Sequence, residues 1–332
     1  MKKILAAVLI LFVATTFAWG ASKVITKPVT LFCAFSAGGG TDQVNRGLAE
    51  GMKEYLGVQV NVVNLTGAGG GIAMDKVWQS PRDGLSILGI SETGLFVPAN
   101  AAHHTTAKDW QWFWAGGSPG VLLVPMDSKY KTFKELVDDA KARPGQVKVA
   151  ASVFPGVWSM RWMAIGNAAG IKTNVLPYAG SAPSVTASLT GEVDAVHVSV
   201  GEALQYMQAK KLRPIVASEI EAVDIPGIGK VAAITDTFPE LKKVLPMPQL
   251  LGIAIPMDTP APIKEEITKA FDAAMKSDAV KKILEAQVAQ PFGWSGDKAN
   301  NMSKSLESKF SWMMVDMNVA KKNPAELGIP KP

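Results

Sequence analysis

The stretch of sequence that decides the fold is residues 29–71, which read VTLFCAFSAGGGTDQVNRGLAEGMKEYLGVQVNVVNLTGAGGG. It contains two glycine loops, AGGGTD at residues 37–42 and NLTGAGGG at residues 64–71. Each loop follows a run rich in β-branched residues and precedes a pattern typical of a helix. This order of strand, glycine loop and helix places clusters of backbone N–H groups at one edge of a sheet, where they bind anions.

The elements around these loops predict a parallel sheet. Residues 29–35, 58–63 and 85–90 are predicted strands, and a short helix is predicted at residues 72–79. A longer helix is predicted where apolar residues recur at every fourth position, namely at Val44, Leu48, Met52 and Leu56. The result is a β-α-β-α-β unit with right-handed crossovers, so both glycine loops lie at the carboxyl edge, where open α/β sheets bind ligands.

The composition is that of a globular protein. Of 332 residues, 48% are hydrophobic and 19% are charged, which argues against disorder, and the length favours two domains. The formal net charge of +5 comes without a dense basic block, so we expect no nucleic-acid partner. Cys33 is the only cysteine, which excludes an intramolecular disulfide, and its place in a predicted strand favours a small buried apolar role.

Residues 1–20 have the pattern of a secretory signal peptide. Lys2 and Lys3 precede an apolar run at residues 4–17, which is too short for a membrane span and ends in Ala18-Trp19-Gly20. We expect export to the periplasm with cleavage near Gly20, which lowers the formal charge from +5 to +3 by removing the two lysines. No cysteine follows at a lipid-attachment spacing, so a free protein is favoured over a lipoprotein.

A second α/β set follows, with predicted strands at residues 147–151, 175–178 and 195–199 and helices between them. A further strand at residues 250–256 and two long helical patterns close the chain, and we assign them to the first domain. The predicted division is residues 21–124 plus 250–332 for the first domain and 125–249 for the second. The ligand cleft lies between the domains, and the two chain crossings form a hinge.

Nucleotide and cofactor motifs are incomplete. The dinucleotide pattern that starts at Gly67 has Ile72 where a small residue belongs, and the one that starts at Gly38 has Gln43 there. Neither loop ends in the Gly-Lys-Ser/Thr of a P-loop. We therefore expect no cofactor.

Catalytic and metal motifs also fail. The G-x-S-x-G match at residues 116–120 is followed by a strand pattern rather than a helix, so it favours a turn between strands. His103 and His104 are adjacent in a polar loop, where neighbouring side chains tend to point apart, and His197 lies in a predicted strand. No Cys or carboxylate group has a metal-ligand spacing, so the sequence predicts neither a metal site nor an enzyme.

Some side chains beside the loops have two open interpretations. Thr41 and Asp42 fit the start of a helix, as an N-cap and a helix-dipole carboxylate, or they contact a ligand directly. Aromatic residues next to the loops are candidates for a pocket wall: Phe35, Phe154, Trp158 and Tyr178. Trp158 and Trp162 are four residues apart, so core packing is favoured for at least one of them.

Several segments together resemble the substrate-binding proteins of tripartite tricarboxylate transporters, the Bug or TctC family. In order these are FSAGGGTD at residues 35–42, GAGG at 67–70, PRDG at 81–84, PYAG at 177–180, GEVD at 191–194 and PMDTP at 256–260. The resemblance covers nearly all of the mature chain. It implies a type II-like, Venus-flytrap periplasmic binding protein with two α/β domains, each a mostly parallel sheet flanked by helices, that closes over a small carboxylate and presents it to the transporter's membrane components.

The resemblance also implies a set of binding residues. In that family, backbone N–H groups and ordered waters of the first two loops hold a carboxylate. The matching positions of the first domain are Ser36, Gly39, Gly40, Thr41, Asp42, Gly67, Ala68 and Gly69. Those of the second domain are Ser152, Gly156, Tyr178, Gly180 and Ser181.

The chain departs from the family pattern at a few positions. Leu65-Thr66 stands where relatives commonly have Arg-Pro, and Phe154 and Met160 align with Gly and His. The wall of the second domain is therefore bulkier and more apolar, and we hypothesise a smaller ligand or one with an aromatic or aliphatic body. We expect a monomer. An exported hydrolase or lyase that uses the same cleft, and a receptor that reports to a sensor protein, remain as alternatives.

Overall fold

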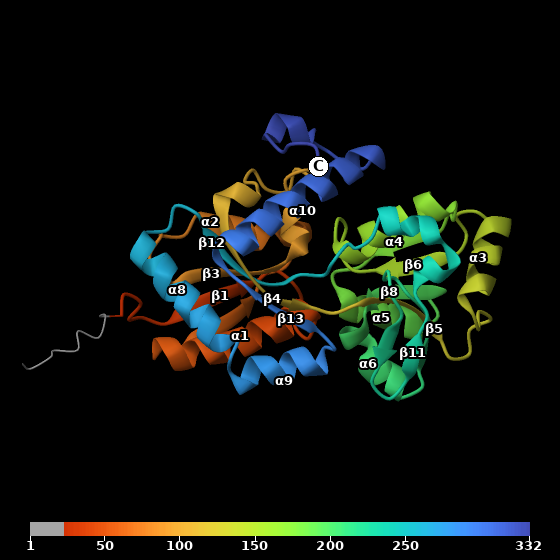
Figure 1. Cartoon of the computed structure of the whole chain (residues 1–332), viewed down its shortest axis with the longest axis horizontal. Coiled ribbons are helices and arrows are strands. Elements are labelled where there is room, and N and C mark those ends of the chain that lie inside the picture. Colours follow the sequence, from red (N-terminus) through yellow and green to blue (C-terminus); the bar gives the residue numbers. More distant parts are fainter. Residues whose placement is uncertain (1–22) are drawn as a thin grey trace, which may run out of the picture.

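A computed structural model describes residues 23–332 of the protein (Figure 1). The expected signal peptide lies outside these residues. Among the described helices, none is both long and apolar enough to cross a membrane. The chain forms two lobes that lie side by side, each built on one sheet with helices on both faces.

The first sheet has the strand order β13-β4-β12-β3-β1-β2. Its strands are β1 (Val29–Cys33), β2 (Val60–Asn64), β3 (Ser86–Ser91), β4 (Trp110–Gly117), β12 (Leu251–Pro256) and β13 (Gln290–Trp294). Its helices are α1 (Gly40–Leu56), α2 (Gly71–Trp78), α8 (Ala261–Ala274), α9 (Asp278–Ala286) and α10 (Gly296–Asp316). β1 pairs in parallel with both β2 and β3, which confirms the predicted β-α-β-α-β unit. The strand β13 and the helix α9 were not predicted.

The second sheet has the strand order β7-β6-β8-β5-β9. Its strands are β5 (Gly120–Pro125), β6 (Lys148–Ala151), β7 (Asn174–Pro177), β8 (Ala195–Ser199) and β9 (Leu212–Ala217). Its helices are α3 (Phe133–Ala142), α4 (Val157–Ala169), α5 (Ser181–Leu189) and α6 (Val200–Gln208). A hairpin of β10 (Val223–Ile225) and β11 (Gly229–Val231), followed by the short helix α7 (Ile234–Thr237), occupies the Pro- and Gly-rich region after residue 220.

Both sheets are mixed rather than mostly parallel. β12 is antiparallel to β3 and β4, and β5 is antiparallel to β8 and β9. The chain enters the second sheet at β5 and returns to the first sheet at β12. No crossover helix of the described chain precedes these strands within their sheets, so they are not forced to run parallel to their neighbours. The expected boundary near residue 124 falls inside the second sheet, because the chain leaves β4 at Gly117 and enters β5 at Gly120.

The strand β4 forms the centre of the larger core. Trp110, Trp112 and Trp114 alternate with Gln111 and Phe113, so the three indoles share one face of the sheet. The rings of Trp112 and Trp114 stack with their centroids 5.2 Å apart. The helix α10 covers this face and accepts the Trp114 indole N–H on Ser303 Oγ at 2.9 Å. The opposite face packs against α1 and α8.

We expect Glu307 on α10 to make stability depend on pH. Burial raises the pKa of this carboxyl to about 8, although it accepts the Ala107 N–H at 2.7 Å. Between the ordinary glutamate pKa and about 8, the folded protein keeps a proton that the unfolded chain releases, so stability falls as the pH rises through this window. Glu307→Gln should reduce this loss in urea unfolding at about pH 5.5 and about pH 8.5. The exposed Glu326→Gln should behave like the wild type, and equal pH dependence in both variants would contradict the assignment.

Candidate functional site

The first glycine loop ends at the amino terminus of α1, at the edge that faces the second lobe. Gly38 has a φ of 82°, which favours glycine, and Gly39 is the N-cap of α1 without a side-chain hydrogen bond. The N–H groups of the first helical turn have no partner inside the helix. The Gly40 N–H donates to Glu202 Oε1 at 2.9 Å, and Glu202 lies 162 residues away on α6 of the other lobe. This loop therefore holds a carboxylate across the two lobes.

The carboxylate of Asp42 stabilises this loop and does not line the cavity. Oδ2 accepts the Gly38 N–H and the Arg46 Nε–H, both at 2.9 Å, and Oδ1 accepts from Asn64 at 2.7 Å. Burial by itself would raise the pKa of Asp42, but these hydrogen bonds hold it below the ordinary value. In this arrangement Asp42 holds the loop in place, and its contact with a ligand stays a prediction.

The third loop of the parallel unit contributes three polar residues that the sequence interpretation missed. Ser91 ends β3, and its hydroxyl accepts the Thr93 N–H at 3.2 Å. Between them, Glu92 is only 1% exposed and accepts the Leu250 N–H at 2.7 Å. Burial raises the pKa of Glu92 to about 7. The predicted strand at residues 85–90 ends just before this loop, at the carboxyl edge of the sheet. That position could have marked these three residues as candidates for the site.

The second lobe closes the site from the opposite side. Ser152 follows β6, Trp158 lies in the first turn of α4, and Gly180 and Ser181 begin α5. A β-carbon at Gly180 would lie 2.7 Å from Ser36 Oγ of the first lobe. Any side chain here would therefore meet the facing loop, and glycine permits the close approach of the two lobes.

These loops enclose a cavity of about 30 Å³ between the lobes. Predicted residues that line it are Phe35, Ser36, Gly39, Gly40, Thr41, Ser152, Trp158, Gly180 and Ser181. Residues that line it without having been predicted are Ser91, Glu92, Thr93, Val153, Val157, Glu202 and Gln249. Among these lining residues are six with hydroxyl groups and two with carboxylates, and there is no lysine or arginine. The volume holds only one or two waters, so a metabolite requires the lobes to separate or side chains to move.

The other predicted residues lie outside the cavity. A β-carbon at Gly69 would be 3.7 Å from the Pro155 carbonyl oxygen, so this glycine lies against the facing lobe. Neither Gly69 nor its neighbours Gly67 and Ala68 line the cavity. The Tyr178 hydroxyl donates to Glu192 at 2.7 Å on the exposed surface. Phe154 packs against the larger apolar cluster, which includes residues of both lobes, and Gly156 is the N-cap of α4. Contact of any predicted residue with a ligand stays a prediction.

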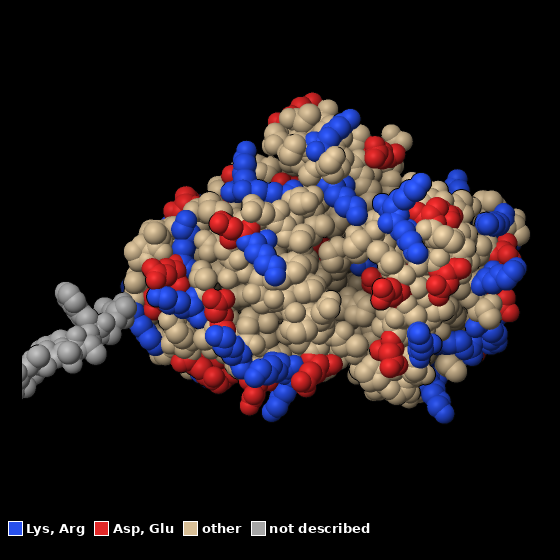
Figure 2. All heavy atoms as spheres, viewed as in Figure 1, with Lys and Arg blue, Asp and Glu red and all other residues tan. Residues whose placement is uncertain are grey.

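Two linker segments run between the lobes beside the cavity. The Ser118 N–H donates to Gln249 Oε1 at 2.9 Å, and the Gly201 N–H donates to Ser118 Oγ at 3.1 Å. The linkers are thus bonded to each other and to the start of α6. In Figure 2, charged side chains of both signs cover the outer faces of the lobes, whereas the surface between them is mostly uncharged.

A buried polar network lies behind the Trp158 wall. Arg161 is 1% exposed and donates to Glu219 Oε1 at 2.6 Å, to Ser218 Oγ at 3.2 Å and to the Met247 carbonyl. His197 Nε2 lies 2.8 Å from the same Ser218 hydroxyl. Burial, with a smaller effect of the Arg161 charge, lowers the pKa of His197 to about 3, so the ring is neutral. Ser218 is fully buried, and no substrate reaches this serine–histidine pair in the described arrangement.

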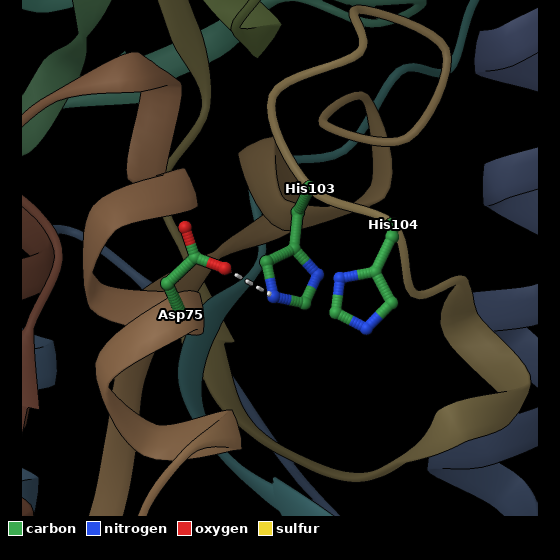
Figure 3. A group of neighbouring side chains, drawn as sticks. All are labelled: Asp75, His103 and His104. Atoms are coloured by element: carbon green, nitrogen blue, oxygen red, sulfur yellow. Dashed lines mark ion pairs between the residues drawn. The ribbon is translucent and has the colours of Figure 1, made fainter.

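A second cluster joins Asp75 of α2 with His103 and His104 of the loop before β4 (Figure 3). The His103 and His104 rings stack with centroids 4.6 Å apart, so the expectation that these neighbours point apart is wrong. His103 Nε2 lies 3.1 Å from Asp75 Oδ1 of α2. The Thr105 N–H donates to His103 Nδ1 at 3.1 Å, which places the ring hydrogen on Nε2, although Nε2 makes no well-aligned hydrogen bond to Asp75. Metal-bound histidines usually donate from their second nitrogen, so this arrangement favours a hydrogen-bond network over a metal site.

Comparison with known proteins agrees with this geometry. The Tripartite tricarboxylate transporter family receptor pattern matches residues 44–315. A protein encoded in the tcbD-tcbE intergenic region of Pseudomonas sp. strain P51 is 26% identical over 302 residues, which cover 88% of this chain and 86% of that protein. Protein BugT of Bordetella pertussis is 27% identical over 271 residues, 80% of this chain and 81% of BugT.

Solved structures show the same fold. The periplasmic binding protein BugD superposes with a TM-score of 0.80 at 21% identity, covering 90% of this chain and all of BugD. MatC from Rhodopseudomonas palustris with bound malate superposes with a TM-score of 0.77 at 20% identity, covering 87% of this chain and 99% of MatC. The chain therefore belongs to the tripartite tricarboxylate transporter receptor family, which confirms the resemblance found in the sequence. It has the two-lobed α/β fold of periplasmic solute-binding proteins.

Proposed function

We propose that this receptor captures a small carboxylate-bearing metabolite in the cavity between its lobes and delivers it to the membrane components of a tripartite tricarboxylate transporter. The observation that carries the proposal is the hydrogen bond from the Gly40 N–H to the Glu202 carboxylate, because it indicates that the N–H groups of this loop can donate to a carboxylate oxygen. The lining hydroxyls, including Ser36 and Ser181, offer further donors. The malate bound to MatC supports the same ligand class.

Capture works by closure of the lobes about the linkers at Ser118 and Gln249. A ligand that contacts loops of both lobes binds the closed form better and shifts the population toward it. We further propose that the protein is exported, is cleaved near Gly20 and works as a periplasmic monomer.

The alternative of an exported hydrolase or lyase has less support. The only serine–histidine pair noted among the described residues, Ser218 with His197, is buried behind Trp158. The low pKa of His197 makes it a poor general base at neutral pH. The cavity itself contains hydroxyl groups without a neighbouring histidine or lysine.

Matched ligand pairs test the proposal. We expect short-chain carboxylates to raise the melting temperature by mass action, whereas their primary amides of equal chain length at the same concentration do not. A saturating carboxylate should also reduce the radius of gyration measured by X-ray scattering, because the lobes close.

The first ligands for this screen are selected by mass spectrometry of the small molecules that gently purified protein releases. Unchanged melting and scattering with every carboxylate would overturn the proposal. Consumption of a bound carboxylate, followed by NMR, would favour the enzyme instead.

A further inference from the structure

We propose that the ligand of this receptor carries a cationic group, such as an ammonium, beside its carboxylate, and that Glu202 recognises this group. This inference rests on the proposed function and narrows its ligand class. Glu202 was not among the residues predicted from the sequence or implied by the family resemblance. Its place in the cavity lining makes it a candidate for a specificity-determining residue.

The charge of the cavity is the first argument. Glu92 and Glu202 both line it, and no lysine or arginine does. Among the ion pairs of residues 23–332, none includes either glutamate. A dicarboxylate enclosed here adds two negative charges beside the carboxylate of Glu202, whereas burial raises the pKa of Glu92 to about 7 and leaves that acid only partly ionised at neutral pH. Little water remains in the cavity to screen the repulsion from Glu202. A ligand with one ammonium offsets this repulsion.

The position of Glu202 is the second argument. Its Oε1 accepts the Gly40 N–H at 2.9 Å, and its Oε2 accepts the Ser199 hydroxyl at 2.6 Å in the capping box of α6. The carboxylate thus lies between the amino termini of α1 and α6. A carboxylate has about four acceptor positions, so capacity remains for a donor from the cavity. A ligand carboxylate placed at the Gly40 N–H would be repelled by the Glu202 carboxylate that already occupies this position.

The other groups that line the cavity offer different partners to the two charged ends of such a ligand. The hydroxyls of Ser36, Thr41 and Ser181 and the N–H groups of the first turn of α1 suit a carboxylate. The glutamates suit the ammonium, and the aromatic rings of Phe35 and Trp158 add a surface that attracts a cation. Arg161 already lies 4.9 Å from the Trp158 ring centroid in such a contact.

A competing explanation is that Glu202 only occupies the position of the ligand carboxylate and is displaced on binding. The two explanations differ in what removal of the charge does. If Glu202 only competes, its neutralisation strengthens the binding of every carboxylate alike. If Glu202 recognises a cation, its neutralisation weakens the binding of amino carboxylates and strengthens the binding of dicarboxylates.

The test is titration calorimetry of the full mature protein with sets of equal chain length. Each set contains a monocarboxylate, its 2-amino and terminal amino derivatives and the dicarboxylate, for example butanoate, 2-aminobutanoate, 4-aminobutanoate and butanedioate, with a longer set built on hexanoate. We expect the better amino carboxylate to bind the wild type at least tenfold more tightly than the dicarboxylate. Glu202→Gln should abolish this preference, and Glu202→Asp should keep part of it.

Controls separate folding, charge and recognition. Gln suits the third position of a capping box, so Glu202→Gln should melt like the wild type. Glu240→Gln removes an exposed charge of the same lobe and should leave the preference unchanged. A wild type that prefers dicarboxylates, or a Glu202→Gln variant that binds all classes more tightly, overturns this inference and leaves the proposed function standing. Absence of binding by every member of the sets overturns the proposed function and this inference with it.

Discussion

Arg161→Met is expected to lower the free energy of unfolding by about 3–5 kcal/mol, the cost of breaking a buried ion pair from one side. Arg161 is 1% exposed on its side chain, and its partner Glu219 is 20% exposed. Methionine fills much of the volume but removes the guanidinium that donates to Glu219 and to the Met247 carbonyl, so that among residues 23–332 only the Gly120 N–H still donates to Glu219 Oε1. Because Met247 belongs to the segment that returns the chain to the first sheet, the loss should also loosen the linker. Urea unfolding at neutral pH measures the effect.

Arg143→Met is the matched control. Arg143 pairs with Asp139 one helical turn away, and its side chain is 43% exposed. Exposed pairs of this kind contribute about 0–1 kcal/mol, so this variant should unfold close to the wild type. Equal effects of the two substitutions would show that Arg161 does not have the structural role assigned to it.

Gly201→Ala is expected to weaken ligand binding at least tenfold while the protein stays folded. Gly201 lies in α6, and a β-carbon there would be 2.2 Å from the carbonyl oxygen of Gln287, which follows α9 in the other lobe. The clash is with backbone, which cannot rotate away as a side chain does. The methyl group should therefore hold the lobes apart. Alanine is the better helix former by up to about 1 kcal/mol, which protects the stability of the second lobe.

Calorimetry gives the affinity of this variant, and X-ray scattering gives its radius of gyration with and without a saturating carboxylate. We expect no reduction of the radius on ligand addition. Gln205→Ala, at an exposed position of the same helix, should bind and close normally. Closure and wild-type affinity in Gly201→Ala would mean that the contact between Gly201 and Gln287 is not part of the closed form.

Local patterns were sufficient to predict the elements of the parallel unit. The glycine loops, the helix with apolar residues at every fourth position and the β-branched runs gave β1, α1, β2, α2 and β3. Each signal depends on neighbours in the chain: φ freedom at glycine, the 3.6-residue repeat of a helix and the handedness of crossovers. The same reasoning placed Ser36, Gly40 and Thr41 at the edge that lines the cavity.

The sequence by itself determined the family, the parallel units and the edge at which the loops gather, because these follow from short-range periodicity and from ordered motifs. Only the tertiary structure decided which groups meet across the lobes. Glu202 takes part in the capping box of α6, yet the same carboxylate accepts the N–H of Gly40 from 162 residues away. Glu92 acquires its raised pKa only through burial in the packed protein, which outweighs the opposite effect of the hydrogen bond from the Leu250 N–H. Contacts of this kind depend on the packing of two sheets, which no local pattern encodes.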